Sequence, residues 1–114
     1  MTTTDPDCLF CKIVAGEVPA ELVGESATAI AFRDIAPKAP VHALVVTREH
    51  HPDVSALAAS DPALLADLVS LADEVASDLS DGQYRMIFNC GPKAGQTVFH
   101  VHAHVLSGTH LAGF

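Results

Sequence analysis

The chain has 114 residues, enough to bury one hydrophobic core, so we expect a single domain over 1–114 with a flexible tail at 1–6. A formal net charge of −8, with no Lys or Arg between Arg48 and Arg85, argues against binding to a nucleic acid polymer, because such binding requires neutralised phosphates. No apolar run is long enough to span a bilayer and no signal peptide is recognisable, so we expect a cytoplasmic protein that binds no membrane.

The N-terminal segment predicts a short helix from Cys8 to about Ala15, with Asp7 as its N-cap. Cys8 and Cys11 would lie one above the other on this helix. Three cysteines in a chain without an export signal indicate thiols or metal ligands rather than a disulfide framework. The CxxC spacing suits either a redox pair or two ligands of a metal ion whose other ligands lie elsewhere.

The remainder predicts an antiparallel sheet and one long helix. Ser60 and Pro62 mark the start of that helix, and apolar residues recur at helical spacing as far as Leu79. The opposite face of the helix is acidic, so we assign it no chemistry. The fold class is therefore α+β, with one long and one short helix and five strands, expected at 21–25, 27–33, 41–47, 84–89 and 98–106.

Several polar residues follow or interrupt these strands. Asp34 directly follows an apolar strand, so its carboxylate could accept hydrogen bonds from a sugar diol or could simply form a turn. His42 interrupts an aliphatic strand, where a hydrogen-bonded core histidine is more frequent than a ligand. His50 and His51 follow that strand, and either could bind a metal or be an exposed loop residue.

The segment from Asn89 to Thr97 combines two glycines with an amide and a hydroxyl. Backbone N–H groups can approach a ligand closely at glycine, and the side chains of Asn89 and Thr97 can add donors, so the segment suits an oxyanion. The spacing of a Walker phosphate loop is absent.

The last predicted strand carries three histidines, His100, His102 and His104, at every second position. Because side chains alternate along a strand, the three imidazoles are expected to share one face. Neutral imidazoles are metal ligands, and an imidazole whose tautomer is fixed is a general base or a nucleophile. The pattern alone leaves both open.

Residues 100–106 resemble the motif of the histidine triad family, His-φ-His-φ-His-φ-φ with φ hydrophobic, and match it at every position. Further segments are similar, in order and spacing, to the Hint branch of that family, and the likeness covers about residues 7–108. These segments are Phe10-x-Lys12-Ile13, Glu17-Val18-Pro19-Ala20, Ala31-Phe32-x-Asp34-Ile35-x-Pro37, Ala39-Pro40-x-His42, Tyr84-Arg85-Met86, Asn89-x-Gly91 and Gly95-Gln96-Thr97-Val98-Phe99-His100.

The resemblance implies a HIT-like fold and a homodimer in which two five-stranded sheets join into one of ten strands. It implies hydrolysis or transfer at the α-phosphorus of purine nucleoside phosphoramidates, including AMP or GMP joined to an amine such as lysine. His102 would be the nucleophile, flanked by His104 and His100 and supported by His42. The residues implied to bind the nucleotide are Leu9, Phe10, Ile13, Phe32 and Ile35 around the base, Asp34 at the ribose, and Asn89, Gly95, Gln96, Thr97, Val98, His102 and His104 around the phosphate.

The resemblance also implies a structural Zn²⁺ bound by Cys8, Cys11, His50 and His100, with no catalytic metal. Two thiolates and two imidazoles would form a closed tetrahedral site. A departure from the family is Thr97, which stands where serine is frequent.

Two other functions remain open from the sequence. The first is hydrolysis of dinucleoside polyphosphates, as in the Fhit-like branch. The second is a nucleotide- or zinc-binding module that acts by binding other proteins, with incidental catalysis. A metalloenzyme that uses all three triad histidines as ligands would leave Cys8 and Cys11 without a role.

Overall fold

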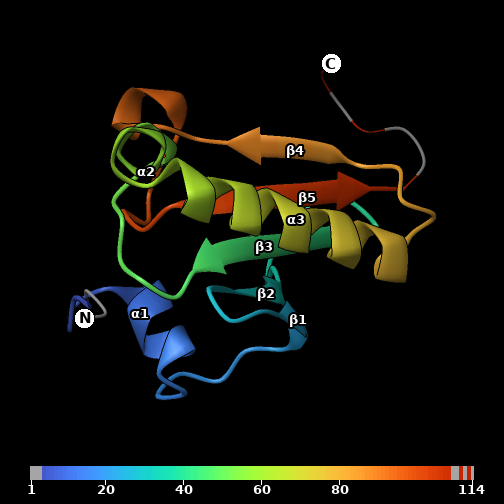
Figure 1. Cartoon of the computed structure of the whole chain (residues 1–114). Coiled ribbons are helices and arrows are strands. Elements are labelled where there is room, and N and C mark those ends of the chain that lie inside the picture. Colours follow the sequence, from blue (N-terminus) through green and yellow to red (C-terminus); the bar gives the residue numbers. More distant parts are fainter. Residues whose placement is uncertain (1–3, 109–110, 112, 114) are drawn as a thin grey trace.

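The computed structural model describes residues 4–108, 111 and 113, and its five strands form one antiparallel sheet in the order β1-β2-β3-β5-β4 (Figure 1). The predicted α+β fold class is confirmed. Within the described ranges, no helix has the length and hydropathy of a membrane span. The strands are β1 Leu22–Glu25, β2 Ala29–Arg33, β3 Val41–Thr47, β4 Arg85–Phe88 and β5 His102–Ser107, and the helices are α1 Leu9–Val14, α2 Val54–Ser60 and α3 Pro62–Leu79, with a 3₁₀ turn at Pro92–Ala94.

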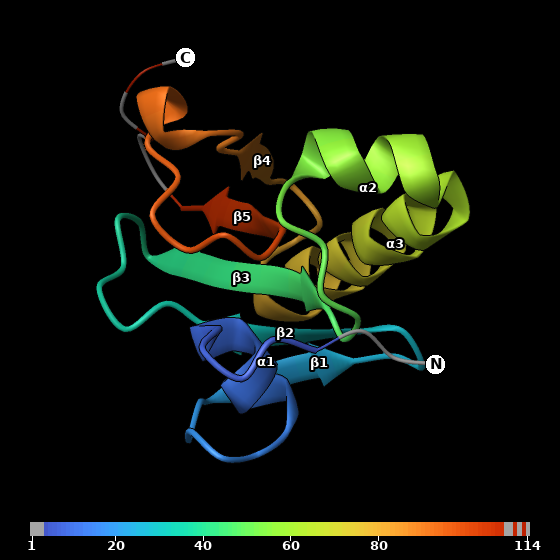
Figure 2. The same cartoon turned by 90° about the vertical axis from the view of Figure 1, so that its left-hand side faces the viewer.

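The two faces of the sheet are covered differently. Side chains alternate along β3, so Ala43 and Val45 pack beneath α3 whereas Leu44 and Val46 point to the opposite face. Figure 2 shows α2 and α3 together on one side of the molecule and α1 apart from them. The stripe predicted for the long helix is confirmed as its buried side, which includes Leu64, Leu68, Leu71, Ala72 and Val75.

A second helix precedes the long one, and the sequence pattern does not predict it. The side chain of Asp53 caps α2 by accepting a hydrogen bond from the amide of Ala56. Asp61 then separates the two helices: its amide donates to the carbonyl of Leu57, and its carboxylate accepts from the amide of Leu64. The predicted cap Ser60 is therefore wrong, because it is the last residue of α2 and Asp61 caps α3.

The cap of the first helix also differs from the prediction. The Sγ atom of Cys8 accepts a hydrogen bond from the amide of Cys11 at 3.4 Å, so Cys8 is the N-cap of α1. The predicted cap, Asp7, lies outside the helix and its amide donates to the carboxylate of Asp5 at 2.9 Å. Both cysteines therefore lie in the first turn of α1, and both are buried.

The last strand begins four residues later than predicted, at His102 instead of Val98. The amide of Val101 donates to the carbonyl of His51 at 2.7 Å, a contact with a loop and not with a neighbouring strand. The ring of His100 is held separately by the carbonyl of Thr47 at 2.7 Å. His100 therefore precedes the strand, and the prediction that all three histidines lie on one strand is wrong.

Candidate functional site

His102 and His104 lie on the face of β5 opposite α3, where His102 is buried and His104 partly buried, with ring centroids 5.2 Å apart. The rings of Phe10 and His102 pack edge to face, at a centroid distance of 5.1 Å. On the opposite face, Ala103 and Val105 are fully buried in the core beneath α3. The alternation of the strand thus anchors its apolar side chains and directs two imidazoles away from the core.

The tautomer of His102 is fixed by one backbone group. Nδ1 of His102 lies 2.9 Å from the carbonyl oxygen of His100, and a carbonyl oxygen can only accept, so the ring proton is on Nδ1. Nε2 then carries the lone pair, and the described residues offer it no hydrogen-bond partner. A neutral imidazole in this state has the arrangement of a nucleophile or a general base.

The second imidazole belongs to a chain of four hydrogen bonds. The amide of Lys38 donates to Nδ1 of His42 at 2.9 Å, which places the proton of His42 on Nε2. That proton is donated to Nδ1 of His104 at 2.9 Å, and Nε2–H of His104 is donated to Oδ1 of Asn89 at 3.1 Å. The amide nitrogen of Asn89 donates in turn to the carbonyl of Ala94 at 2.8 Å. Both rings are therefore neutral donors with their protons on Nε2.

The pKa values of these rings agree with the neutral form. Burial lowers the pKa of His104 to about 4, and the neighbouring rings of His102 and His42 lower it further, whereas Asp34 opposes the shift. Burial is also the main cause of the lowered pKa of His42. Near pH 7 the rings of His42 and His104 are thus uncharged.

Asp34 lies in the loop between β2 and β3 with its two carboxylate oxygens in different environments. Oδ1 accepts from the amide of Ala36 at 2.8 Å, which forms the turn that the sequence suggested as one alternative. Oδ2 lies 3.4 Å from Nε2 of His42, and the side chain is 20% exposed. One oxygen therefore closes the turn, while the other reaches the site.

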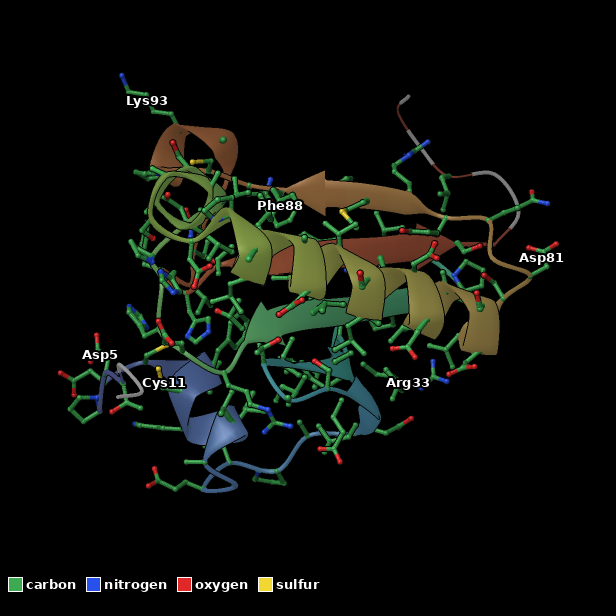
Figure 3. The ribbon with its side chains drawn as sticks, in the orientation of Figure 1. Asp5, Cys11, Arg33, Asp81, Phe88 and Lys93 are labelled. Atoms are coloured by element: carbon green, nitrogen blue, oxygen red, sulfur yellow. The ribbon has the colours of Figure 1, made fainter. Side chains whose placement is uncertain are left out.

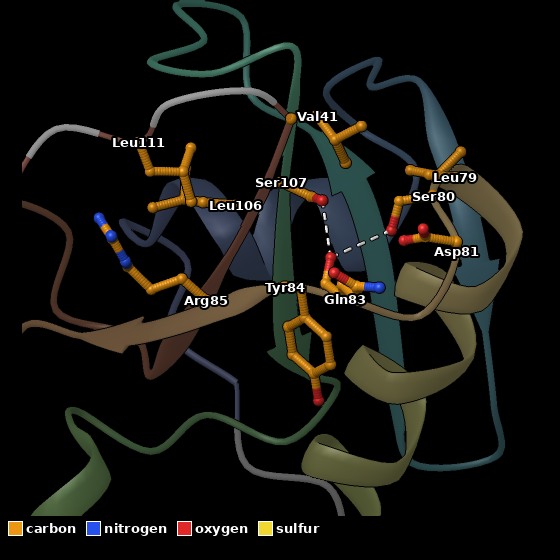
Figure 4. Close-up of a pocket in the computed structure, with 11 residues that line it drawn as sticks. Val41, Leu79, Ser80, Asp81, Gln83, Tyr84, Arg85, Leu106, Ser107 and Leu111 are labelled. Atoms are coloured by element: carbon orange, nitrogen blue, oxygen red, sulfur yellow. Dashed lines mark hydrogen bonds between the residues drawn. The ribbon is translucent and has the colours of Figure 1, made fainter. Parts of the chain in front are cut away.

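A cavity of about 380 Å³ gathers several of the predicted polar residues. Asp34, His42, Asn89 and His104 line it, so residues from two strands, β3 and β5, and from the loops that follow β2 and β4 meet there. A larger cavity of about 600 Å³ is shown in Figure 4, and the described residues that line it include none of the predicted site residues. In that larger cavity the hydroxyl of Ser107 donates to the carbonyl of Gln83 at 2.6 Å, and the hydroxyl of Ser80, 3.3 Å from the same carbonyl, is closer to the carbonyl of Ala76 at 2.7 Å.

Gln96 is buried beneath the loop that follows β4 and binds three backbone groups. Its Oε1 accepts from the amide of Gly91 at 2.8 Å, and its Nε2 donates to the carbonyls of Pro52 at 2.7 Å and Val98 at 3.1 Å. The carboxamide therefore connects both ends of this loop to the loop that follows β3. Gly95 in this loop has a φ of +89°, a backbone conformation that favours glycine. Thr97, two residues later, is exposed.

The apolar residues predicted around a base are only partly brought together. The rings of Phe10 and Phe32 are buried and pack edge to face, with centroids 5.5 Å apart. Ile13 is partly buried against the same cluster. Leu9 is 45% exposed and Ile35 is completely exposed, so these two side chains have apolar surface available for a ligand.

The four predicted metal ligands form a compact cluster at the beginning of α1. The candidate ligand atoms of Cys8, Cys11, His50 and His100 all lie within 4.8 Å of one another. Nδ1 of His100 is 3.3 Å from Sγ of Cys8 and 3.5 Å from Sγ of Cys11, and Nδ1 of His50 is 3.4 Å from Sγ of Cys11 (Figure 3 labels Cys11). His51 does not join this group, because its ring is 3.2 Å from the carboxylate of Glu49.

The hydrogen bonds of His100 suit this cluster to a metal ion. Because Nε2 of His100 donates to the carbonyl of Thr47, the lone pair is on Nδ1 and faces the thiols. Burial lowers the pKa of His100 to about 4 and raises the pKa of the Cys11 thiol. Two sulfur and two nitrogen donors at these separations could hold a tetrahedral metal ion.

A second group of potential ligands, Asp34, His42 and His104, has the same compactness but a different hydrogen-bond pattern. The amide of Lys38 occupies Nδ1 of His42, so Nε2 of that ring carries a proton and points it at His104. A protonated nitrogen has no lone pair for a metal. The tautomers thus leave lone pairs available for a metal ion at the cysteine cluster and form a chain of hydrogen bonds here. Sequence reasoning missed this role of the Lys38 amide, because a backbone group leaves no signal in the sequence.

Comparison with known proteins was consistent with these features. A family model of the HIT domain matches residues 15–111. An uncharacterized HIT-like protein of Synechocystis is 46% identical over 103 residues, which are 90% of each chain. A HIT family hydrolase from Clostridium thermocellum is 42% identical with a TM-score of 0.90, covering 97% of this chain and 98% of that one. A histidine triad nucleotide-binding protein from Candida albicans is 29% identical with a TM-score of 0.79, covering 87% and 73% respectively.

Proposed function

Because the chain belongs to the histidine triad (HIT) family, we propose that it cleaves purine nucleoside phosphoramidates at the α-phosphorus, as a member of the Hint branch would. The substrates would be AMP or GMP joined to an amine, including the side chain of lysine. Support comes from the site itself and from relatives: the one from Clostridium thermocellum is named a hydrolase, and the one from Candida albicans a nucleotide-binding protein.

The observation that carries this proposal is the hydrogen bond between Nδ1 of His102 and the carbonyl of His100. It leaves the lone pair on Nε2, which would form a bond to phosphorus as the bond from phosphorus to the amine breaks. The amine leaves with a proton taken from water, and the ring of His102 acquires a positive charge that the carbonyl of His100 stabilises. Water then attacks phosphorus, breaks the bond to Nε2 and releases the nucleotide and a proton.

The charge that develops on the phosphate oxygens would be met by groups around the loop after β4. Nε2–H of His104 faces this loop and the side-chain amide of Asn89 lies along it, whereas the backbone N–H groups of Ala94, Gly95 and Gln96 already donate to carbonyls within the loop. The exposed hydroxyl of Thr97 would donate to the phosphate or the leaving group. Each such donor typically contributes about 3 kcal/mol to the stability of the transition state.

The remaining predicted residues would bind the nucleoside. Oδ2 of Asp34 would accept from the ribose hydroxyls, since Oδ1 is already occupied by the turn. Phe10 and Phe32 would support one face of the base, and Ile13, Leu9 and Ile35 would enclose it. Val98 and the buried Gln96 would contribute by holding the loop in place.

We also propose that the cluster of Cys8, Cys11, His50 and His100 binds a structural Zn²⁺. The ion would cross-link α1 to the loop after β3 and to the segment before β5. In addition, we propose a homodimer in which the two sheets join into one of ten strands. Among the described strands, β1 and β4 are the edges at which such joining is possible.

A direct assay tests the function. The purified protein is mixed with adenosine 5′-phosphoramidate and, separately, with diadenosine polyphosphates, and AMP release is followed with His102→Asn as the control. Release from the phosphoramidate that depends on His102 is expected. Faster release from the polyphosphates would favour the Fhit-like reaction, and release from neither would leave a nucleotide- or zinc-binding module as the function.

A further inference from the structure

The chain of hydrogen bonds through His42 and His104 has a fixed direction. It begins at the backbone amide of Lys38, which can only donate, and ends at the backbone carbonyl of Ala94, which can only accept. Each intermediate group must therefore accept on the Lys38 side and donate on the Ala94 side. Two loops that are more than 50 positions apart in the sequence thus specify the same proton positions on both rings.

The direction matters most at His104. Its Nδ1 already accepts the N–H of His42 at 2.9 Å, so a second proton could bind there only if that hydrogen bond were lost. Its single proton is on Nε2 and points toward the loop after β4. We infer that His42 is a positioning residue that keeps His104 neutral, with one N–H directed at the loop that would bind the phosphate.

The consequence for catalysis rests on the proposed function. An approaching phosphate oxygen would replace Asn89 as the acceptor of Nε2–H, and its negative charge would favour a second proton on the ring. The filled Nδ1 opposes that protonation. His104 then donates to the phosphate throughout the reaction without forming an imidazolium that would retain the anionic product.

Both imidazole rings and charged side chains of either sign face His104. His102 lies beside it on β5, and His42 comes from β3. Asp34, Lys38 and Arg85 line the same cavity. The carboxylate of Asp34 favours protonation of His104, whereas burial disfavours it and has the larger effect.

Only the backbone amide of Lys38 takes part in the chain of hydrogen bonds through His42 and His104. Its amide donates to His42, while its side-chain nitrogen is 3.4 Å from the carbonyl of Ala36 on the exposed surface of the loop. Substitution of the side chain should therefore leave the proton positions unchanged, whereas removal of the N–H should not. Lys38→Ala and Lys38→Pro form a matched pair that separates the two.

The decisive variant is His42→Phe, which keeps a ring of similar volume but has no N–H to donate. Long-range ¹H–¹⁵N NMR of the imidazoles reports directly which nitrogens carry protons and needs no substrate. In the wild-type protein, His104 is expected to carry one proton, on Nε2, near pH 7. In His42→Phe we expect Nδ1 of His104 to take up a proton at a pH at least about one unit higher than in the wild type. Unchanged protonation and an unchanged tautomer in a folded His42→Phe would overturn the inference.

The lysine pair provides a second measurement. Lys38→Ala is expected to give the wild-type spectrum, and Lys38→Pro a spectrum in which His42 no longer has a single tautomer. A folded Lys38→Pro with wild-type tautomers on both rings would also overturn the inference. If Lys38→Pro does not fold, the result for His42→Phe decides.

Kinetics separate this inference from the proposed function. If the wild type releases AMP from the phosphoramidate, His42→Phe should lower kcat at least about tenfold, but less than the 10²–10³-fold that follows complete loss of a donor. Its affinity for AMP should change less than kcat does, because the one described contact of His42 with a proposed nucleoside-binding residue is the 3.4 Å approach of its Nε2 to Oδ2 of Asp34. If the wild type releases no AMP, the proposed function fails, and the NMR result still tests the proton positions.

Discussion

The carbonyl of His100 accepts the Nδ1 proton of His102 at 2.9 Å, while the ring of the same His100 lies 3.3 Å from the sulfur of Cys8. One residue therefore joins the candidate nucleophile to the candidate metal cluster. Its second ring nitrogen is bound to the carbonyl of Thr47 in β3, so both its side chain and its backbone are held. The position of His100 before β5, rather than in it, is what allows this double role.

The metal cluster can be tested by removing its sulfur ligands. Cys8→Ser/Cys11→Ser should contain no zinc and unfold at a lower temperature, because two of four ligands are lost from a site that cross-links three segments. Cys90→Ser is the matched control, since Cys90 is exposed and lies outside the cluster. Metal analysis of the purified proteins should find one zinc per chain in the wild type and the control. A full equivalent of zinc in the double variant would contradict the assignment.

Gln96 is expected to stabilise the loop that would bind the phosphate. Gln96→Ala removes a buried carboxamide that supplies one acceptor and two donors to partly buried backbone groups, and it should lower the free energy of unfolding by about 2 kcal/mol. The exposed Gln83 is a suitable control, and Gln83→Ala should change the stability by less than about 0.5 kcal/mol. Urea unfolding of both variants measures the difference. Equal stability of the two would mean that the carboxamide does not hold the loop.

Stability should depend on pH through His104. Its pKa is about 4 in the folded protein and near 6.5 when unperturbed, so the unfolded chain binds the proton more readily. The contribution to stability is complete above about pH 6.5 and is lost as the pH falls toward about 4, by about 2 kcal/mol after allowance for solvent screening. His104→Gln should therefore lose less stability than the wild type over this range. Parallel pH dependence of unfolding in the two proteins would show that His104 is not the group responsible.

The role proposed for Asp34 concerns the ribose. Asp34→Asn can keep the turn with Ala36 but loses the charge, so it should weaken AMP binding by about tenfold. The loss should be smaller for 2′-deoxy-AMP, which offers one hydroxyl fewer. Asp78→Asn is the matched control, because Asp78 is an exposed residue of α3, and it should leave the affinities for both nucleotides unchanged. Isothermal titration with the two nucleotides measures the effect, and an equal loss for both would indicate that Asp34 acts by its charge alone.

Much of the fold could be predicted from residue patterns. The hairpin, the loop after it, β3 and the apolar stripe of α3 follow from alternation, prolines and helical spacing. The helix α2 was missed because its sequence is short and has one fully buried residue, Leu57, so it lacks a periodic stripe. The start of β5 was misplaced because hydrogen bonds to Thr47 and His51 hold the preceding residues, and a strand pattern does not show such long-range contacts.

The candidate site was predictable in its residues but not in its proton positions. The spacing of the histidines and the CxxC pair marked side chains that the fold brings together, and the resemblance to the HIT family supplied their expected roles. The tautomers depend on the amide of Lys38 and on the carbonyls of His100 and Thr47. Backbone groups are the same at every position of a sequence, so only the folded chain shows which of them bind a given ring.

The most direct test of this account is to trap the intermediate on His102. The protein is quenched with base during turnover of adenosine 5′-phosphoramidate, digested, and examined by mass spectrometry for an adenylylated peptide. One adenylyl group is expected, on His102, that forms and decays at the rate of AMP release and is missing in His102→Asn. Steady AMP release without this adduct, or an adduct on His104 instead, would show that His102 is not the nucleophile.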